Sequence, residues 1–206
     1  SVERVVAPDG LAYDRGAVPA GHESTWSCLN GTENAPADWF EYIQQMGGTD
    51  VNGTTSPDRT NYFQTVPTGA LDRILMLESD RMGHLLDAVT QEKLDNQRGV
   101  VQNEKRQGDN QPGGLVFYEI IKTLFPAPHP YDHTPIGSMA DLDAATMDTV
   151  QKWFRDNYGP NNATLVLAGD ISPEQARPMV EKYFGPIARG PVNEPALAEI
   201  TELSSD

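Results

Sequence analysis

Residues 39–66 read WFEYIQQMGGTDVNGTTSPDRTNYFQTV, and this stretch decides the fold class. In its first part, Trp39, Phe40 and Ile43 can share one face of a short helix, because their spacing matches the 3.6-residue period of an α-helix. The glycine pair at 47–48 ends that helix. The pattern then loses the helical period, which indicates that a different kind of element follows.

A β-hairpin is the element that follows. Thr49 to Thr55 and Arg59 to Val66 form two extended segments, separated by the turn Ser56-Pro57-Asp58. The second segment is rich in Thr, Tyr, Phe and Val, which half-buried strands favour. A short helix that leads into a hairpin predicts a sheet with helices packed against it.

Helical patterns dominate the rest of the chain. From Gly69 to Val89 apolar residues recur at helical spacing, which predicts one long amphipathic helix or two helices joined at Gly83. Further helices are predicted at 91–107, 113–124, 144–157 and 172–184, and a strand is predicted at 163–168. This order of elements predicts an α+β fold, with helices on one face of a mixed or antiparallel sheet.

Three parts are predicted along the chain. Residues 1–29 are rich in Gly, Pro, Ala and Asp and follow neither the helical nor the strand period, so this segment is expected to be irregular or divergent. Residues 30–190 carry the predicted domain. Residues 191–206 have the composition of a linker or tail.

Composition limits the classes of function. The chain has 206 residues and 30 acidic against 15 basic side chains, a formal charge of -15 that repels phosphate and argues against nucleic-acid binding. No apolar run is long enough to predict a membrane span. Ser1 to Arg4 have neither the basic nor the apolar region of a signal peptide. The single cysteine, Cys28, excludes an internal disulfide.

Glu104 is the candidate functional carboxylate. It lies in the predicted helix 91–107 and continues an apolar stripe with three-then-four spacing, so we expect it on the inward face. A structural explanation is an ion pair with Arg98 or Lys105. The stripe consists of Leu94, Gln97, Val101 and Glu104.

The run from Asn30 to about Arg189 resembles the N-terminal half of bacterial insulinase/pitrilysin-type peptidases, a family that includes mitochondrial processing peptidase. The resemblance implies an α+β metalloenzyme half-domain. In the family two long strands precede the catalytic helix, and they are expected to be missing here. The matching segments are Asn30-Gly31-Thr32-Glu33-Asn34, Gly47-Gly48 through Tyr62, Arg98 through Glu104, His129-Pro130-Tyr131 with Ile136-Gly137-Ser138, and Tyr158 through Ala163.

The catalytic motif of that family is degenerate in this sequence. In the family, H-x-x-E-H on one helix supplies two zinc ligands and a general base, and a later glutamate supplies the third ligand. Counted back from Asn30, the first histidine position falls on His22, the base on Thr25 and the second histidine on Trp26. Glu104 matches the third ligand. Threonine is no general base at neutral pH, and an indole offers no lone pair to zinc.

The resemblance therefore implies a zinc metalloendopeptidase-family domain that has lost peptide-bond hydrolysis. Zinc is the cofactor in the family, and weak or absent zinc binding is expected here. The chain is expected to act at most as a peptide-binding or partner subunit, with a peptide or protein substrate and a second peptidase half as partners. Asn52 corresponds to a family edge strand that pairs with extended substrate, and its alternative is a plain polar edge residue.

Two other interpretations remain open. The first is an active zinc endopeptidase that uses His22 and Glu104 with recruited ligands, but Glu23 and Cys28 both lie off the face that His22 would occupy on a helix. The second is a truncated or frame-shifted gene product without function, because residues 11–29 depart from the family pattern. The compartment, periplasm or cytoplasm of a bacterium, also remains open.

Overall fold

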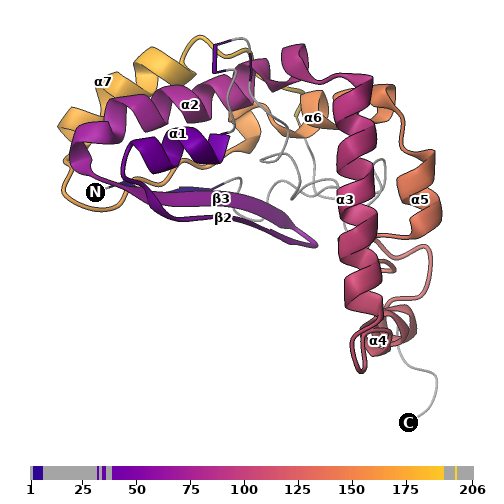
Figure 1. Cartoon of the computed structure of the whole chain (residues 1–206). Coiled ribbons are helices and arrows are strands. Elements are labelled where there is room, and N and C mark those ends of the chain that lie inside the picture. Colours follow the sequence, from indigo (N-terminus) through magenta and orange to yellow (C-terminus); the bar gives the residue numbers. More distant parts are fainter. Residues whose placement is uncertain (1, 7–31, 33, 36–38, 193–197, 199–206) are drawn as a thin grey trace.

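The computed structural model describes residues 2–6, 32, 34–35, 39–192 and 198 (Figure 1). In this part of the chain a three-stranded antiparallel sheet has the order β1-β3-β2. Helices α1, α2 and α7 lie over one face of that sheet (Figure 1). The predicted α+β class with helices on one face of an antiparallel sheet is therefore confirmed. The strands are β1 (Val2–Val6), β2 (Thr49–Ser56) and β3 (Arg59–Val66), and the helices are α1 (Trp39–Gln45), α2 (Leu71–His84) and α7 (Pro173–Phe184).

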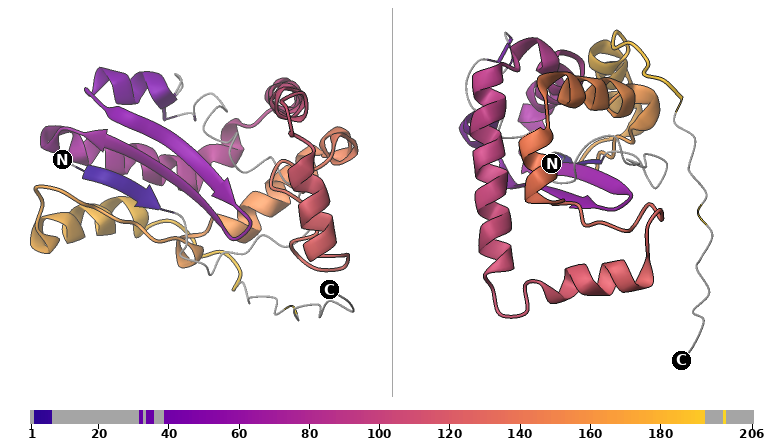
Figure 2. Two further views of the ribbon diagram at one scale, coloured as in Figure 1. Left: turned by 90° about the horizontal axis from the view of Figure 1, so that it is seen from below. Right: turned by 90° about the vertical axis from the view of Figure 1, so that its right-hand side faces the viewer.

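The remaining helices form a second region beside the sheet. Helix α3 (Gln91–Asp109) is a long rod, and α4 (Val116–Leu124) lies at its far end, away from α1, α2 and α7 (Figures 1 and 2). Helices α5 (Met139–Ala144) and α6 (Met147–Asn157) lead the chain back towards the sheet layer. The short 3₁₀ helices are η2 (Thr68–Ala70), η3 (Leu85–Ala88) and η4 (Pro160–Asn162).

Two hydrophobic clusters hold these regions together. The first joins the sheet to α1 and α2, with Ile43, Ile74 and Leu75 almost completely buried, and α7 covers its flank. Gly48 is required at the end of α1, since a Cβ there would lie 2.2 Å from Ile43 Cγ2. The second cluster joins η3, α3 and α6 around Trp153. Truncating any fully buried side chain of this size costs about 2–5 kcal/mol.

The register of the hairpin pairs Asn52 with Phe63 and Thr54 with Asn61. Each pair shares one face of the sheet. A β-bulge interrupts the pairing between Thr49 and Asn52, and the bulge contains Asp50 at a positive φ of 52°. A bulge of this kind bends an edge strand and re-aims its side chains.

Two sequence predictions are contradicted within the described residues. Residues 1–29 were expected to be irregular and the two N-terminal strands missing, but Val2–Val6 forms one strand, β1, that pairs with β3. Residue 1 and residues 7–29 lie outside the described residues. A short strand of this kind is specified by the ladder it joins rather than by its own period. The strand predicted at 163–168 forms only an isolated bridge at Thr164. Leu165 and Leu167 still pack on the first cluster, so burial without a ladder explains the apolar alternation.

Most helices were predicted correctly. Helix α7 has the capping box expected from Ser172 and Gln175, with Pro173 in its first turn. The helix in 69–89 runs through Gly83 to His84 and then tightens into η3. Helix α5 was not predicted. No helix in the described ranges is both long and apolar enough to cross a bilayer.

Candidate functional site

Glu104 does not lie on the inward face of α3. The buried residues of that helix are Leu94, Val101 and Lys105, and Glu104 is exposed. The prediction placed the next inward residue three positions after Val101, at Glu104. The helix instead buries the residue four positions after Val101, which is Lys105. Lys105 can occupy this position because its ammonium group lies between Asp109 and Tyr118, which offset the loss of water. The expectation of an inward Glu104 is therefore wrong, although its place on α3 is as predicted.

Asn52 lies on an edge strand, as expected. In the sheet order β1-β3-β2, strand β2 has β3 on one side and no described strand on the other. Asn52 is exposed, and its Oδ1 accepts a hydrogen bond from the Gly53 amide at 2.8 Å. The hairpin points towards α3 (Figure 1). This edge has the form that adds an extended peptide as a further strand.

The hairpin tip is fastened to the loop that follows α4. Tyr131 donates its hydroxyl hydrogen to Asp58 Oδ2 at 2.5 Å. The His129 ring packs 4.7 Å from that of Phe125, and its Nδ1 accepts from the Tyr131 amide at 3.0 Å. These contacts give His129 a loop-shaping role, and His133 pairs with its neighbour Asp132.

The turn at Thr32 and Asn34 is held by a buried carboxylate. Asp80 of α2 accepts a short hydrogen bond from the Thr32 hydroxyl on Oδ2 and one of 2.6 Å from Asn34 Nδ2 on Oδ1. The Thr32 hydroxyl in turn accepts from the Ala35 amide at 3.0 Å. Both Asp80 and Thr32 are more than nine-tenths buried. This tether fixes the start of the segment that leads into α1.

A buried polar cluster lies next to that tether on the same helix. The Glu78 carboxylate pairs with Arg81 and accepts from Gln64 Nε2 at 3.3 Å. The Arg81 guanidinium lies 4.0 Å from the ring centre of Tyr62, whose hydroxyl is 2.7 Å from that of Tyr158. Burial alone would lower the pKa of Arg81, but the Glu78 carboxylate outweighs it, so the pKa is raised above its usual value. The cluster is therefore charged, paired and structural.

Sequence reasoning missed Glu78, Asp80 and Arg81. A signal for Glu78 was available, because it follows Ile74 and Leu75 by four and three residues and so continues the inward face of α2. A charged residue on such a face needs a buried partner. Nothing in the sequence alone identified Gln64 or Thr32 as those partners.

Only part of the predicted metal site lies among the described residues. His22, Thr25 and Trp26 lie outside the described residues, so of the predicted metal positions the structure places Glu104 alone. In the described part of the chain, no three His, Cys, Asp or Glu side chains gather closely enough to hold a metal ion. In the register counted back from Asn30, the predicted donor set would not fit zinc, because Trp26 has no lone pair to donate.

Comparisons with known proteins identify relatives over most of the chain. The family model described as insulinase (peptidase family M16) matches residues 27–129, and the model described as peptidase M16 inactive domain matches residues 144–203. A zinc protease, PqqE, of Helicobacter pylori is 32% identical over 154 residues, 74% of this chain and 34% of that protein. A probable mitochondrial-processing peptidase subunit beta of Schizosaccharomyces pombe is 24% identical, over 81% of this chain and 36% of that protein. The chain thus spans about a third of the length of these relatives.

Solved structures have the same fold. The crystal structure of a protease from Helicobacter pylori superposes with a TM-score of 0.78 and 26% identity, covering 97% of this chain and 48% of that one. The periplasmic protease PqqL from Escherichia coli gives a TM-score of 0.79 at 21% identity, covering 96% of this chain and 22% of that one. Together, the matched family model, the 32% identical zinc protease and the shared fold show that the chain belongs to the insulinase family of metallopeptidases, peptidase family M16.

Proposed function

We propose that this chain is a non-catalytic member of family M16 that binds extended peptide or serves as the partner of a second peptidase half. The proposal takes residues 30–190 as the domain. One observation carries it: in the register set by Asn30, Thr25 and Trp26 stand where the family places a base and a zinc-binding histidine. Zinc would activate water for attack on a peptide bond in the family, and this donor set cannot hold it in that way.

Peptide binding is the activity that the remaining geometry supports. Strand β2 offers an edge to an added strand, and Asn52 is exposed in the middle of it. The Asn52 side chain accepts from the Gly53 amide, while its Nδ2 group carries two further donors. The hairpin that carries this edge is fastened at its tip through Asp58 and Tyr131, which keeps the strand in place for pairing.

Elemental analysis tests the loss of the metal site. We expect less than one zinc per chain after dialysis, and no zinc-dependent hydrolysis of casein. One tightly held zinc per chain, lost in a Glu104→Gln variant but kept in Glu92→Gln on the same helix, would overturn the proposal. That result would instead support an active enzyme with recruited ligands.

Restoring the motif provides the complementary test. In a Thr25→Glu/Trp26→His variant, His22 and Glu104 would be joined by the missing base and ligand. We expect this double variant to take up zinc that the natural chain does not retain. If the variant retains no more zinc than the natural chain does, the register assigned to His22, Thr25 and Trp26 is wrong.

A fluorescent peptide without charged residues tests the edge strand. Anisotropy should report binding that weakens about threefold to tenfold in Asn52→Ala, the effect of losing one hydrogen bond. Thr49→Ala, exposed on the other side of the bulge, should bind as the natural chain does. Equal affinity in all three proteins would remove Asn52 from the binding site.

A further inference from the structure

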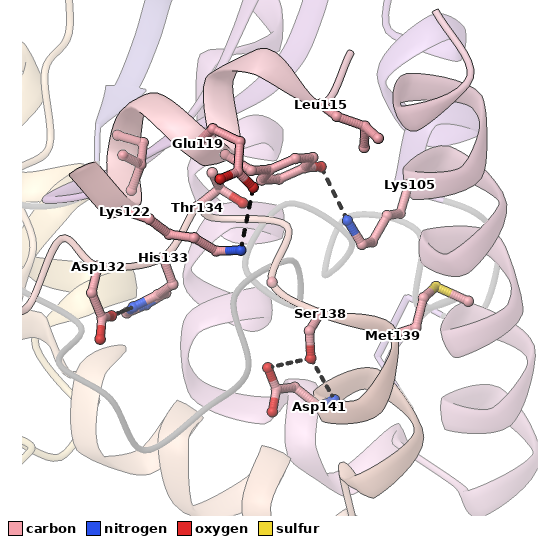
Figure 3. A pocket seen from close by; sticks show the side chains of 13 residues that line it. Lys105, Leu115, Glu119, Lys122, Asp132, His133, Thr134, Ser138, Met139 and Asp141 are labelled. Atoms are coloured by element: carbon pink, nitrogen blue, oxygen red, sulfur yellow. Dashed lines mark hydrogen bonds and ion pairs between the residues drawn. The ribbon is translucent and has the colours of Figure 1, made fainter. Parts of the chain in front are cut away.

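A cavity lies between α4, the end of α3 and residues 132–141 (Figure 3). Its volume is about 340 Å³. An apolar cavity of about 150 Å³ holds benzene, so this cavity has room for a molecule of roughly two rings. The volume also lies within the range of small-molecule sites in proteins, about 300–1,000 Å³.

Much of the wall of this cavity is apolar. It includes Leu115, Ile121, Met139 and the ring of Tyr118. None of these side chains is part of either hydrophobic cluster of the described residues, and none is fully buried. A ligand with an apolar body would remove this surface from water, which is favourable. A thioether and a tyrosine ring both make favourable contacts with aromatic rings, so the wall suits an aromatic body.

One buried polar side chain of the wall has an unused hydrogen-bonding group. Thr134, in the loop before α5, is only 7% exposed and lines the cavity. Its carbonyl accepts from the Gly137 amide at 3.0 Å, whereas its hydroxyl has no hydrogen bond to any described residue. A buried hydroxyl without a partner is unfavourable. A ligand that carries an acceptor would give this hydroxyl a partner.

The contact between α3 and α4 fixes the shape of the cavity. The Tyr118 hydroxyl donates to Asp109 Oδ1 at 2.9 Å and accepts from Lys105 Nζ at 3.1 Å. The Lys105 ammonium also lies 3.2 Å from Asp109 Oδ2 and 4.3 Å from the centre of the Tyr118 ring. Figure 3 shows Lys105 reaching from α3 towards α4. The wall is therefore ordered before a ligand binds, which lowers the cost of binding.

The charges around the cavity favour a neutral ligand. Each basic side chain of the wall lies within 4.0 Å of an acidic one, so none is left to attract an anion. Asp141 accepts from the Ser138 hydroxyl at 2.7 Å and has no basic partner among the described residues. An anion would meet this excess of negative charge, and a cation would lose its hydration against the apolar wall. The pairs are Lys105 with Asp109, Lys122 with Glu119, and His133 with Asp132.

We propose that this cavity binds a small neutral aromatic molecule of roughly two rings, which accepts a hydrogen bond from the Thr134 hydroxyl. No residue of β2 lines the cavity, so the site is separate from the edge strand to which peptide binding is assigned. The inference does not depend on the proposed function.

Titration with 2-naphthol, followed by its fluorescence, tests the role of Thr134. For a ligand of this size we expect a dissociation constant on the order of 0.1–1 mM. Thr134→Val should weaken binding about threefold to tenfold, the effect of losing one hydrogen bond. Thr134→Ser, which keeps the hydroxyl, should bind as the natural chain does. Because the hydroxyl has no partner inside the described chain, Thr134→Val should not lower the urea midpoint of the free protein.

Filling the cavity tests its location. Ile121→Trp should weaken the binding of 2-naphthol at least tenfold. Ile120→Trp alters the neighbouring isoleucine of α4, which is 46% exposed and does not line the cavity, so it should leave binding unchanged. The anion 2-naphthoate should bind the natural chain more weakly than 2-naphthol does. Circular dichroism of each variant verifies that the fold is retained.

The absence of saturable binding at millimolar 2-naphthol would overturn the proposal. Binding that survives Ile121→Trp would place the probe elsewhere on the protein, with the same consequence. Equal affinity of the natural chain and Thr134→Val would remove the hydrogen bond from the site, and tighter binding of 2-naphthoate would overturn the neutral class of ligand. These outcomes are independent of zinc content and of peptide binding at β2.

Discussion

Helices α2 and α4 place polar and apolar side chains in opposite ways. Helix α2 buries Glu78, Asp80 and Arg81, each less than a tenth exposed, whereas α4 leaves Phe117 more than half exposed. Burying charge is unfavourable unless each group is paired, and exposing an aromatic ring forgoes the gain from burial. The charges of α2 therefore need partners, and they have them inside the chain. The exposed apolar side chains of α4 belong to neither hydrophobic cluster of the described residues.

The buried polar residues of α2 also differ from Glu104, the predicted functional carboxylate of α3. The polar residues of α2 hold the turn at Thr32 and, through Gln64, the strand β3, so their role is structural. Glu104 on α3 is exposed, so its side chain does not contribute to the packing of the core.

The largest effect is expected from breaking the buried ion pair of α2. Glu78→Ala leaves the Arg81 guanidinium buried without its carboxylate, which should lower the free energy of unfolding by about 3–5 kcal/mol. Urea unfolding measures this loss, and Glu78→Gln should fold if the alanine variant does not. The exposed pair of Lys152 and Asp156 is the matched comparison, since Lys152→Ala should cost about 0.5 kcal/mol or less. Similar losses in the two pairs would show that the α2 pair is not buried in solution.

A smaller effect is expected from the tether at the turn. Asp80→Ala leaves the Thr32 hydroxyl buried without its acceptor, at a cost of about 1–3 kcal/mol in unfolding free energy. The Ala35 amide, which donates to Thr32, should also exchange its hydrogen faster. Asp87→Ala, at an exposed position near the end of the same helical region, should change neither quantity. Unchanged exchange at Ala35 in Asp80→Ala would mean that the turn holds without the carboxylate.

The stability contributed by the contact between α3 and α4 should depend on pH. The hydrogen bond from Tyr118, together with Lys105, lowers the pKa of the Asp109 carboxyl. The ionised Asp109 therefore stabilises the fold above the ordinary pKa of an aspartate, which is about 3.9. That effect is lost as the pH falls through the depressed folded value. Burial works against the charge of Lys105, but its hydrogen bonds to Tyr118 and Asp109 raise its pKa, so its contribution disappears only in strong alkali.

Urea midpoints at several pH values check this assignment. The difference in stability between the natural chain and Asp109→Asn should be present at pH 7 and vanish in strong acid. Asp109→Asn combined with Tyr118→Phe should add little to either substitution alone, because both act on one joint. A difference that persists in acid would assign the effect to packing rather than to the charge of Asp109.

The elements of this fold that could be predicted from the sequence are those with a strong local period. The hairpin and α7 were predicted because Ser56-Pro57-Asp58 and the Ser172 cap leave few alternatives. The presence of β1 and the absence of a full strand at 163–168 could not be predicted, because strand pairing depends on residues far along the chain. At the candidate site, the edge position of Asn52 was predicted correctly. The orientation of Glu104 was wrong, because spacing alone cannot decide between steps of three and four.

The smallest effect is expected at the exposed Phe117 of α4. Phe117→Ser, measured at concentrations too low for association, should change the free energy of unfolding by about 0.5 kcal/mol or less, because the ring is already in water. Phe154, the same residue type in the second hydrophobic cluster, is 5% exposed, and Phe154→Ala should cost about 3–5 kcal/mol. If Phe117→Ser instead cost more than about 1 kcal/mol in the monomer, the ring would be packed within the chain. Phe117 of α4 would then belong to the core, and the contrast with α2 would no longer hold.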